Sequence, residues 1–113
     1  MIIGGRMYLC YNNQKIELCC QDGFKNRLMG IMFKKDKLDK ALYFKGCNSI
    51  HTFFCKQDIA VIMTDKDDRI IYFNNKVRPN KVIIKLKAYN TYELPVGYFK
   101  KLKVNTYLRK EEC

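Results

Sequence analysis

The chain has 113 residues, 48% of them hydrophobic, and its 22 basic and 11 acidic side chains give a net charge of +11. This length suffices for one hydrophobic core, so we expect a single domain over residues 1–113. Charged residues interrupt every apolar stretch well before the roughly eighteen residues that cross a membrane, and residues 1–10 lack the continuous apolar run of a secretory signal. We therefore expect a cytoplasmic protein without membrane insertion.

The first predicted element is a β-hairpin. Residues 7–11 and 15–20 flank the pair Asn12-Asn13, and asparagine tolerates the positive φ values that tight hairpin turns need. Beyond the hairpin, Asp22 can cap a short helix through RLMGIMF at residues 27–33, whose apolar side chains approximate one helical face. This part of the chain therefore predicts two strands and one short helix.

Strand signals dominate from residue 41 onwards. β-branched and aromatic side chains are concentrated in four segments, and such residues favour extended backbone over helix. The segments are ALYF at 41–44, SIHTFF at 49–54, IAVIMT at 59–64 and RIIYF at 69–73. The polar turn at 65–68 is expected to join the last two as a hairpin.

Two more strand regions follow. In VIIKLKAY, residues 82–89, apolar and basic side chains alternate, which predicts a half-buried strand. Its expected buried face holds Val82, Ile84, Leu86 and Ala88, and its exposed face holds Lys81, Lys85 and Lys87 together with Ile83. TYELP at 91–95 and NTYL at 105–108 then bracket a helical turn predicted within 96–102. The whole pattern predicts a mainly β fold, a small barrel-like domain of about eight short strands with one or two short helices.

Six cysteines and a single histidine raise the question of a metal or redox site. The cysteines are at positions 10, 19, 20, 47, 55 and 113, without a CxxC pair, and without export we expect reduced thiols. Along the predicted strand of CNSIHTFFC, residues 47–55, neighbours four apart are separated by about 13 Å, too far to bind one metal ion. We therefore expect no metal and no other cofactor, although a cross-strand Cys10, Cys19 or Cys20 leaves a metal or redox role open.

Several motifs in chain order resemble one protein family. They are RLMGIMF at 27–33, ALYF at 41–44, CNSIHTFF at 47–54, IMTDKDDRI at 62–70, RP at 78–79 and ELPVG at 93–97. The chain thus resembles the domain of unknown function 192 family, also called uncharacterised protein family 0127, over roughly residues 7–108. The resemblance implies a compact β-barrel-like domain that usually stands alone, with no established reaction and, in many members, a secretion signal that this chain lacks. The family's aspartate position holds Ala60 here, whereas Asp58 lies two residues earlier and, by strand parity, on the same face.

The first functional interpretation is a non-catalytic binding module, in which a pocket forms where CNSIHTFF meets ELPVG. Both motifs place polar groups among large apolar side chains, which is typical of ligand sites. The candidate ligand-binding residues are His51, Thr52, Phe54, Glu93 and Pro95. We expect a monomer that binds a small ligand or another protein.

Catalysis has little support in the sequence. The chain contains no GxSxG, P-loop or HExxH motif and no paired carboxylates at a telling spacing, so no catalytic residue is assigned. A Cys-His nucleophile pair within one strand is excluded by distance. The thiols that His51 could still activate are those of Cys10, Cys19, Cys20 and Cys113. We expect that the protein is not an enzyme.

The second interpretation is a basic surface that binds nucleic acid or another polyanion. Clustered cations attract phosphates through counterion release, and nearby aromatic rings can stack on bases. The candidate residues are Lys76, Arg78, Lys81, Lys85 and Lys87. Because no RNP-like, KH or helix-turn-helix signature accompanies them, we expect weak nonspecific binding, and lysines on strand exteriors also serve simply to protect edges.

Overall fold

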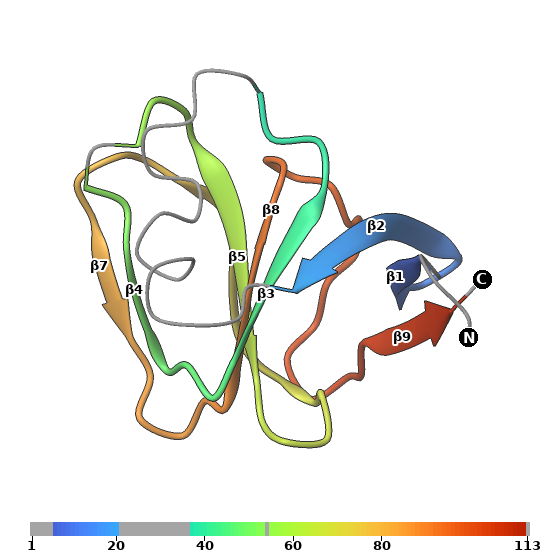
Figure 1. Cartoon of the computed structure of the whole chain (residues 1–113). Coiled ribbons are helices and arrows are strands. Elements are labelled where there is room, and N and C mark those ends of the chain that lie inside the picture. Colours follow the sequence, from blue (N-terminus) through green and yellow to red (C-terminus); the bar gives the residue numbers. More distant parts are fainter. Residues whose placement is uncertain (1–5, 21–36, 54, 113) are drawn as a thin grey trace.

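Nine strands in two sheets make up the computed structural model of the chain, which describes residues 6–20, 37–53 and 55–112 (Figure 1). Their bounds are β1 (Met7–Tyr11), β2 (Gln14–Cys20), β3 (Ala41–Lys45), β4 (Ser49–His51), β5 (Ile59–Thr64), β6 (Ile70–Val77), β7 (Val82–Ile84), β8 (Asn90–Leu94) and β9 (Arg109–Glu112). Seven of them form one sheet in the order β6-β5-β8-β3-β2-β1-β9, and β4 pairs with β7. The prediction of a mainly β domain is therefore confirmed.

The predicted first hairpin is confirmed in its register and its turn. β1 pairs antiparallel with β2, so that Tyr11 lies opposite Gln14. Between them Asn12 and Asn13 have φ values of 50° and 65°. Two consecutive positive φ values are typical of the turn whose twist matches the two strands, which is why two asparagines suit this position.

The centre of the large sheet, β3, β8 and β5, separates two apolar clusters. All six residues of β5 are buried, because alternate side chains enter opposite clusters. The Tyr92 cluster contains Leu9, Ile16, Leu18, Ala41, Ala60, Ile62, Ile70, Tyr92, Leu94, Phe99 and Leu108. The Leu42 cluster contains Leu38, Leu42, Phe44, Cys47, Cys55, Ile59, Val61, Met63, Val77 and Ala88. The sheet is thus covered on both faces, which explains the long apolar run of β5.

The β4–β7 ribbon packs against the Leu42 cluster through Ile50 and Ile83, which lie opposite each other. Thr52, just beyond β4, connects the two strands of the ribbon by hydrogen bonds. Its backbone N–H donates to the Lys81 carbonyl oxygen at 2.9 Å, and its hydroxyl donates to the Arg78 carbonyl oxygen at 2.8 Å. The Lys81 N–H donates in turn to the Thr52 hydroxyl oxygen at 2.9 Å. A buried threonine therefore holds the turn that leads into β7.

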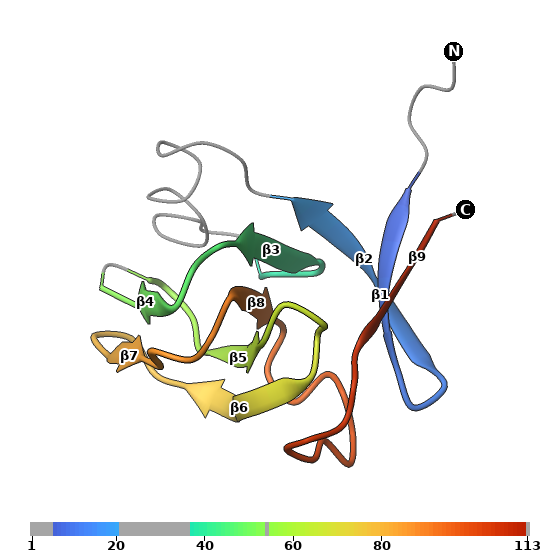
Figure 2. The same cartoon turned by 90° about the horizontal axis from the view of Figure 1, so that it is seen from below.

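The predicted barrel-like closure is wrong, because the hydrogen-bonded order of the large sheet ends at β6 and at β9. Figure 2 shows how the sheet bends between its β3-β8-β5-β6 part and the crossing strands β1, β2 and β9. An isolated antiparallel bridge between Arg69 and Tyr107 connects the start of β6 to the segment that precedes β9. There the Ile70 N–H donates to the Thr106 carbonyl oxygen at 2.7 Å. The two end strands, β6 and β9, therefore do not pair with each other along their length.

The helix predictions have two outcomes. The helix predicted from Asp22 through 27–33 lies outside the described residues. The helical turn predicted within 96–102 is wrong: this stretch forms turns, with a Tyr98 N–H to Pro95 carbonyl hydrogen bond of 3.1 Å and a φ of 62° at Gly97. None of the residues in 6–20, 37–53 and 55–112 belongs to a helix. Within these ranges, accordingly, no helix is present that could cross a membrane.

The prediction of which face of residues 82–89 is buried is wrong. Val82 and Ile84 are each 56% exposed and Leu86 is 84% exposed, whereas Ile83 packs on the Leu42 cluster. The strand is also shorter than predicted and ends at Ile84. The partner strand decides this, because cross-strand neighbours share a face and Ile83 lies opposite the inward-facing Ile50. Ala88 is buried as predicted.

Candidate functional site

The candidate site is centred on Glu93, a carboxyl group in the middle of the large sheet. Glu93 lies on β8, opposite Leu42 of β3 and Val61 of β5, and its side chain is 4% exposed. Cross-strand neighbours share a face, so the carboxyl group points into the Leu42 cluster. Within the described part of the chain, Glu93 Oε1 is the buried side-chain oxygen or nitrogen that lacks a hydrogen-bond partner.

Burial changes the protonation of this carboxyl group. Removal from water disfavours the charged form and raises the pKa of Glu93 to about 8. Near neutral pH the group is therefore mostly a neutral carboxylic acid, which can donate one hydrogen bond and accept others. A buried polar atom without a partner costs about 1 to 3 kcal/mol, so this position carries a free-energy penalty in the absence of a ligand.

Cys55 connects this carboxyl group to the CNSIHTFFC segment. Burial raises the pKa of the Cys55 thiol to about 11, and the charge of Glu93 adds to the effect. The thiol therefore stays protonated and packs in the Leu42 cluster as an apolar group. Cys55, directly after the CNSIHTFF motif, is thus close enough to Glu93 for the charge of the carboxylate to act on the thiol.

The other predicted ligand-binding residues have different positions. His51 is exposed on the outer face of β4, where its Nδ1 accepts the Phe53 N–H at 3.3 Å and its ring stacks on Phe53 with centroids 5.1 Å apart. Thr52 is buried in the turn described above. Pro95 is half-buried in the turn that follows β8, and Phe54 lies outside the described residues. Ile50 faces inward between Ser49 and His51, so His51 and Glu93 lie on opposite sides of the ribbon's backbone.

No set of metal ligands is assembled in the described part of the chain, where no group of three His, Cys, Asp or Glu side chains is close enough to hold an ion. Cys47 illustrates why: its thiol is buried and donates to the Ser49 carbonyl oxygen at 3.0 Å. The arrangement at Glu93 is one carboxyl and one thiol among hydrocarbon side chains. Such a donor set suits hydrogen bonding to a ligand better than coordination of a transition metal.

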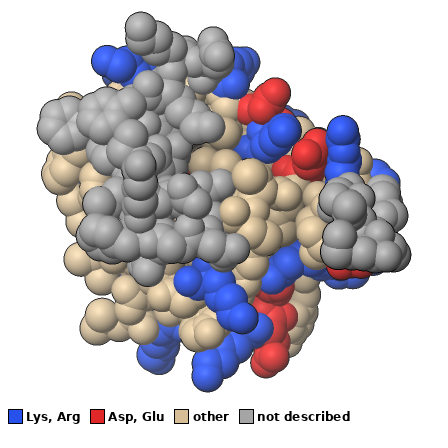
Figure 3. Space-filling view, in the orientation of Figure 1, with Lys and Arg blue, Asp and Glu red and all other residues tan. Residues whose placement is uncertain are grey.

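The predicted basic residues are exposed, but they do not form one set of free cations. Lys76 and Arg78 share the Asp58 carboxylate, with N–O distances of 3.9 and 3.6 Å. Lys85 places its ammonium group 4.5 Å from the centroid of the Tyr72 ring. In Figure 3 the basic side chains are scattered over the visible face with uncharged atoms between them. Charge alone therefore defines no compact anion site on this face.

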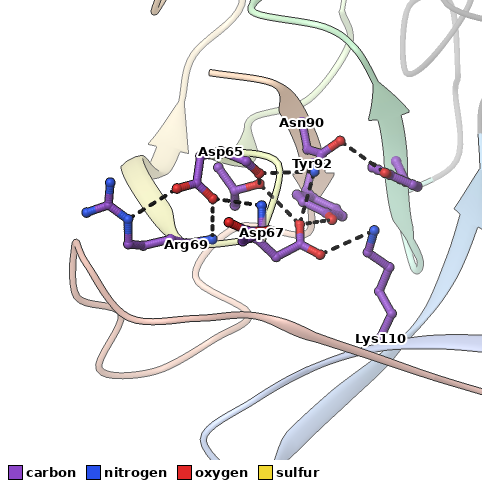
Figure 4. A network of polar contacts seen from close by, with 9 residues as sticks. Asp65, Asp67, Arg69, Asn90, Tyr92 and Lys110 are labelled. Atoms are coloured by element: carbon purple, nitrogen blue, oxygen red, sulfur yellow. Dashed lines mark hydrogen bonds and ion pairs between the residues drawn. The ribbon is translucent and has the colours of Figure 1, made fainter. Parts of the chain in front are cut away.

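A polar network around the turn between β5 and β6 was missed by the sequence interpretation (Figure 4). At its centre is Asp68, whose φ is 62°. Its Oδ1 accepts the hydroxyl groups of Tyr92 at 2.6 Å and Thr64 at 3.1 Å and the side-chain N–H of Asn90 at 3.2 Å, and its Oδ2 lies 3.3 Å from the Lys110 ammonium. One carboxylate thus links β5, β8 and β9.

Neighbouring groups complete this network. Burial would raise the pKa of Asp65, but hydrogen bonds from the backbone and side chain of Arg69 and from the Asp67 N–H outweigh it and lower the pKa. Burial would likewise lower the pKa of Lys110, and its contacts with Tyr43 and Asp68 raise it instead. The sequence feature that could have indicated this network is DKDDR between two strands, which was interpreted only as a turn. Because these polar groups satisfy one another, we interpret the network as a structural element rather than a ligand site.

Comparisons with known proteins inform the fold. No family model and no curated protein matches the chain. A "putative transcription regulator" from Sinorhizobium meliloti 1021 has a similar structure, with a TM-score of 0.75 and 17% identity over 96% of this chain and 92% of that one. A protein of unknown function from Novosphingobium aromaticivorans DSM 12444 is also similar, with a TM-score of 0.74 and 9% identity over 92% of this chain and 83% of that one. Likeness at such identities shows a shared fold.

Proposed function

We propose that this chain is a non-catalytic binding module that receives a small, largely apolar ligand against the carboxyl group of Glu93. The observation that carries the proposal is the buried Oε1 atom without a hydrogen-bond partner among the described residues. Native proteins satisfy the great majority of buried polar atoms, so an exception in the middle of a sheet calls for an explanation. A ligand group that completes the hydrogen bonding supplies one.

The chemistry around Glu93 indicates what kind of ligand fits. The Leu42 cluster offers hydrocarbon and thiol surfaces, which favour an aliphatic or aromatic body. The carboxyl group favours a head group that donates hydrogen bonds, and a primary ammonium combines donation with opposite charge. When an ammonium binds, the carboxylic acid loses its proton to the solvent and the two groups form an ion pair. We therefore propose an aliphatic amine as the ligand class.

Hexylamine and hexanol are suitable probes for this proposal, because they share a tail and differ in the head group. Titration calorimetry at pH 7 in two buffers of different ionisation enthalpy should show hexylamine binding with release of about 0.9 proton per site, given the pKa of about 8. Hexanol should bind at least tenfold more weakly and release no proton. Equal affinity for the two probes would contradict the proposed role of the carboxyl group.

A matched pair of variants isolates this carboxyl group. Glu93→Gln keeps the size of the side chain and removes its ability to ionise when an ammonium binds, so hexylamine affinity should fall at least tenfold and proton release should disappear. Glu17→Gln changes a half-buried glutamate on β2 and should leave both quantities unchanged. Unaltered hexylamine binding by Glu93→Gln would place the binding elsewhere.

A second candidate function is nonspecific binding of a polyanion by Lys76, Arg78, Lys81, Lys85 and Lys87. It is supported by the exposure of these side chains and by the description of the Sinorhizobium neighbour as a "putative transcription regulator". The shared Asp58 carboxylate weakens it, because part of the positive charge is already paired. We therefore rank it below the binding of a small ligand.

Salt dependence tests the polyanion candidate. Single-stranded RNA and duplex DNA should bind weakly, without sequence preference, and should be largely released at physiological ionic strength, because each neutralised phosphate adds nearly one unit of log-log slope. Replacing Lys81, Lys85 and Lys87 with glutamine should weaken this binding further. Submicromolar binding to one sequence at physiological salt would make nucleic-acid recognition the better account of the protein. Fluorescence anisotropy measures both outcomes.

The wider setting of the protein is also a proposal. We propose that the chain is a cytoplasmic monomer and belongs to the domain of unknown function 192 family. The motifs CNSIHTFF and ELPVG in the sequence support the assignment. Ala60, at the family's aspartate position, is buried in the Tyr92 cluster, while Asp58 pairs with Lys76 and Arg78 at the surface. Any role of the family's aspartate is therefore not carried by Ala60.

A further inference from the structure

Among the strands that the structure describes, β7 pairs with β4 alone, and the geometry of its other edge follows from this pairing. The Thr52 N–H donates to the Lys81 carbonyl, and the Lys85 N–H donates to the Asn48 carbonyl at 2.9 Å. In an antiparallel pair, hydrogen-bonded and non-hydrogen-bonded positions alternate. Val82 and Ile84 therefore occupy non-hydrogen-bonded positions, and their backbone N–H and C=O groups point away from β4. In Figure 1, β7 forms the outer margin of the molecule beside β4.

The outer face of this ribbon is apolar and exposed. Val82 lies opposite His51, and Ile84 lies opposite Ser49, so their side chains share the face that Ile50 and Ile83 do not occupy. Phe53 is 40% exposed beside His51 and stacks on its ring, and Leu86, just beyond β7, is exposed as well. Contiguous exposed apolar side chains on a soluble domain mark interaction surfaces. We call the set Phe53, Val82, Ile84 and Leu86, with the β7 edge, the β7 surface.

The charge around the β7 surface is positive. Lys81, Lys85 and Lys87 are exposed and flank or follow the strand. Asp58 is already paired with Lys76 and Arg78, and among the described residues no carboxylate forms an ion pair with Lys81, Lys85 or Lys87. The partner that complements this surface is therefore negatively charged.

We infer that β7 pairs with an extended acidic segment of another protein, which adds a third strand to the β4–β7 sheet. The outward backbone groups of Val82 and Ile84 supply the hydrogen bonds of such strand addition. Alternate side chains of the segment pack on the β7 surface, and its carboxylates approach Lys81, Lys85 and Lys87. Lysines beside a short edge strand are also a common protection against aggregation. Protection alone does not account for three large aliphatic side chains exposed on and just after that strand.

Proline at position 84 provides a selective test. Because the Ile84 N–H points away from β4, Ile84→Pro removes an outward donor and leaves the β4–β7 hydrogen bonds in place. A fluorescent peptide of about ten residues that alternates glutamate with valine is the probe. In anisotropy titrations we expect Ile84→Pro to weaken its binding at least tenfold, whereas Ile84→Thr, which keeps the N–H, should weaken it less than fivefold. Equal loss in both variants would show that no strand pairing is involved.

A peptide variant keeps the test decisive if Ile84→Pro fails to fold. Methylation of alternate backbone nitrogens, on the edge that would face β7, should abolish binding to the unmodified protein, and methylation of the other edge should have little effect. Equal binding of both methylated peptides would overturn the inference. So would an oligothymidylate that competes with the peptide and binds more tightly at physiological salt, because the β7 surface would then serve nucleic acid. Glu93→Gln should not alter peptide binding, which separates this inference from the proposed amine site.

Discussion

Replacing Asp68 with alanine should lower the free energy of unfolding by about 2 to 3 kcal/mol, because it removes a half-buried carboxylate that accepts the Tyr92 hydroxyl and pairs with Lys110. Three hydrogen-bond donors and the Lys110 ammonium surround this carboxylate, whose side chain is 15% exposed. Alanine would leave the Tyr92 hydroxyl and the Lys110 ammonium without this acceptor. The Thr64 hydroxyl and the Asn90 amide would keep the Asp65 carbonyl oxygen, at 2.9 and 3.3 Å. Alanine also tolerates the positive φ of 62° poorly. Chemical denaturation followed by circular dichroism measures the loss.

Two further variants separate the causes of this effect. Asp68→Asn keeps an acceptor oxygen and tolerates positive φ, so its destabilisation should be about half that of alanine and should report the charge contact with Lys110. Asp67→Ala changes the preceding, exposed aspartate and should alter stability by less than about 0.5 kcal/mol. Equal stability of the Asp68→Ala and Asp67→Ala proteins would show that the network contributes little to the fold.

The second large effect is a dependence of stability on pH that originates at Glu93. Burial raises the folded-state pKa from 4.5 to about 8, so between these values the folded protein keeps a proton that the unfolded chain has lost. Stability is therefore highest below pH 4.5 as far as this group is concerned, and it decreases as pH rises towards 8. Between pH 5 and pH 7 the decrease should be about 2 to 3 kcal/mol.

Glu93→Gln should remove this dependence, because the amide does not titrate. At pH 7 the variant should be more stable than the unmodified protein by about 2 to 3 kcal/mol, and near pH 4 the two should be nearly equal. Urea unfolding of both proteins across pH 4 to 8 gives the difference and cancels the contributions of other titrating groups. A constant difference at every pH would mean that the pKa of Glu93 is not raised in the folded protein.

The two expectations for Glu93→Gln have a joint meaning. A substitution that stabilises the protein and abolishes hexylamine binding identifies a residue retained for binding at the expense of stability. Stabilisation without loss of binding would leave Glu93 as a buried carboxyl group of no established use. The stability and binding measurements therefore need to be made on the same variant.

Local sequence determined the elements whose formation depends on neighbouring residues alone. Asn12 and Asn13 have the conformational tolerance that a two-residue hairpin turn requires, so the first hairpin could be placed correctly. The apolar run of β5 has no alternation because clusters lie on both faces of the sheet, and its β-branched residues still marked a strand. The predicted pocket between CNSIHTFF and ELPVG stays a prediction: Glu93 acts on the thiol of Cys55, just after the first motif, whereas His51 is exposed on the outer face of β4.

Tertiary structure alone decided the features that depend on distant partners. Ile83 faces inward because it lies opposite Ile50, and this reverses the face that the alternation of residues 82–89 predicted. Asp68 acquired its role from Tyr92 and Lys110, which are far away in the sequence. Glu93 has no local signal of burial: its raised pKa arises because β3 and β5 flank β8 and exclude water from the carboxyl group. Side-chain periodicity describes one strand at a time, whereas burial and charge depend on which strands become neighbours.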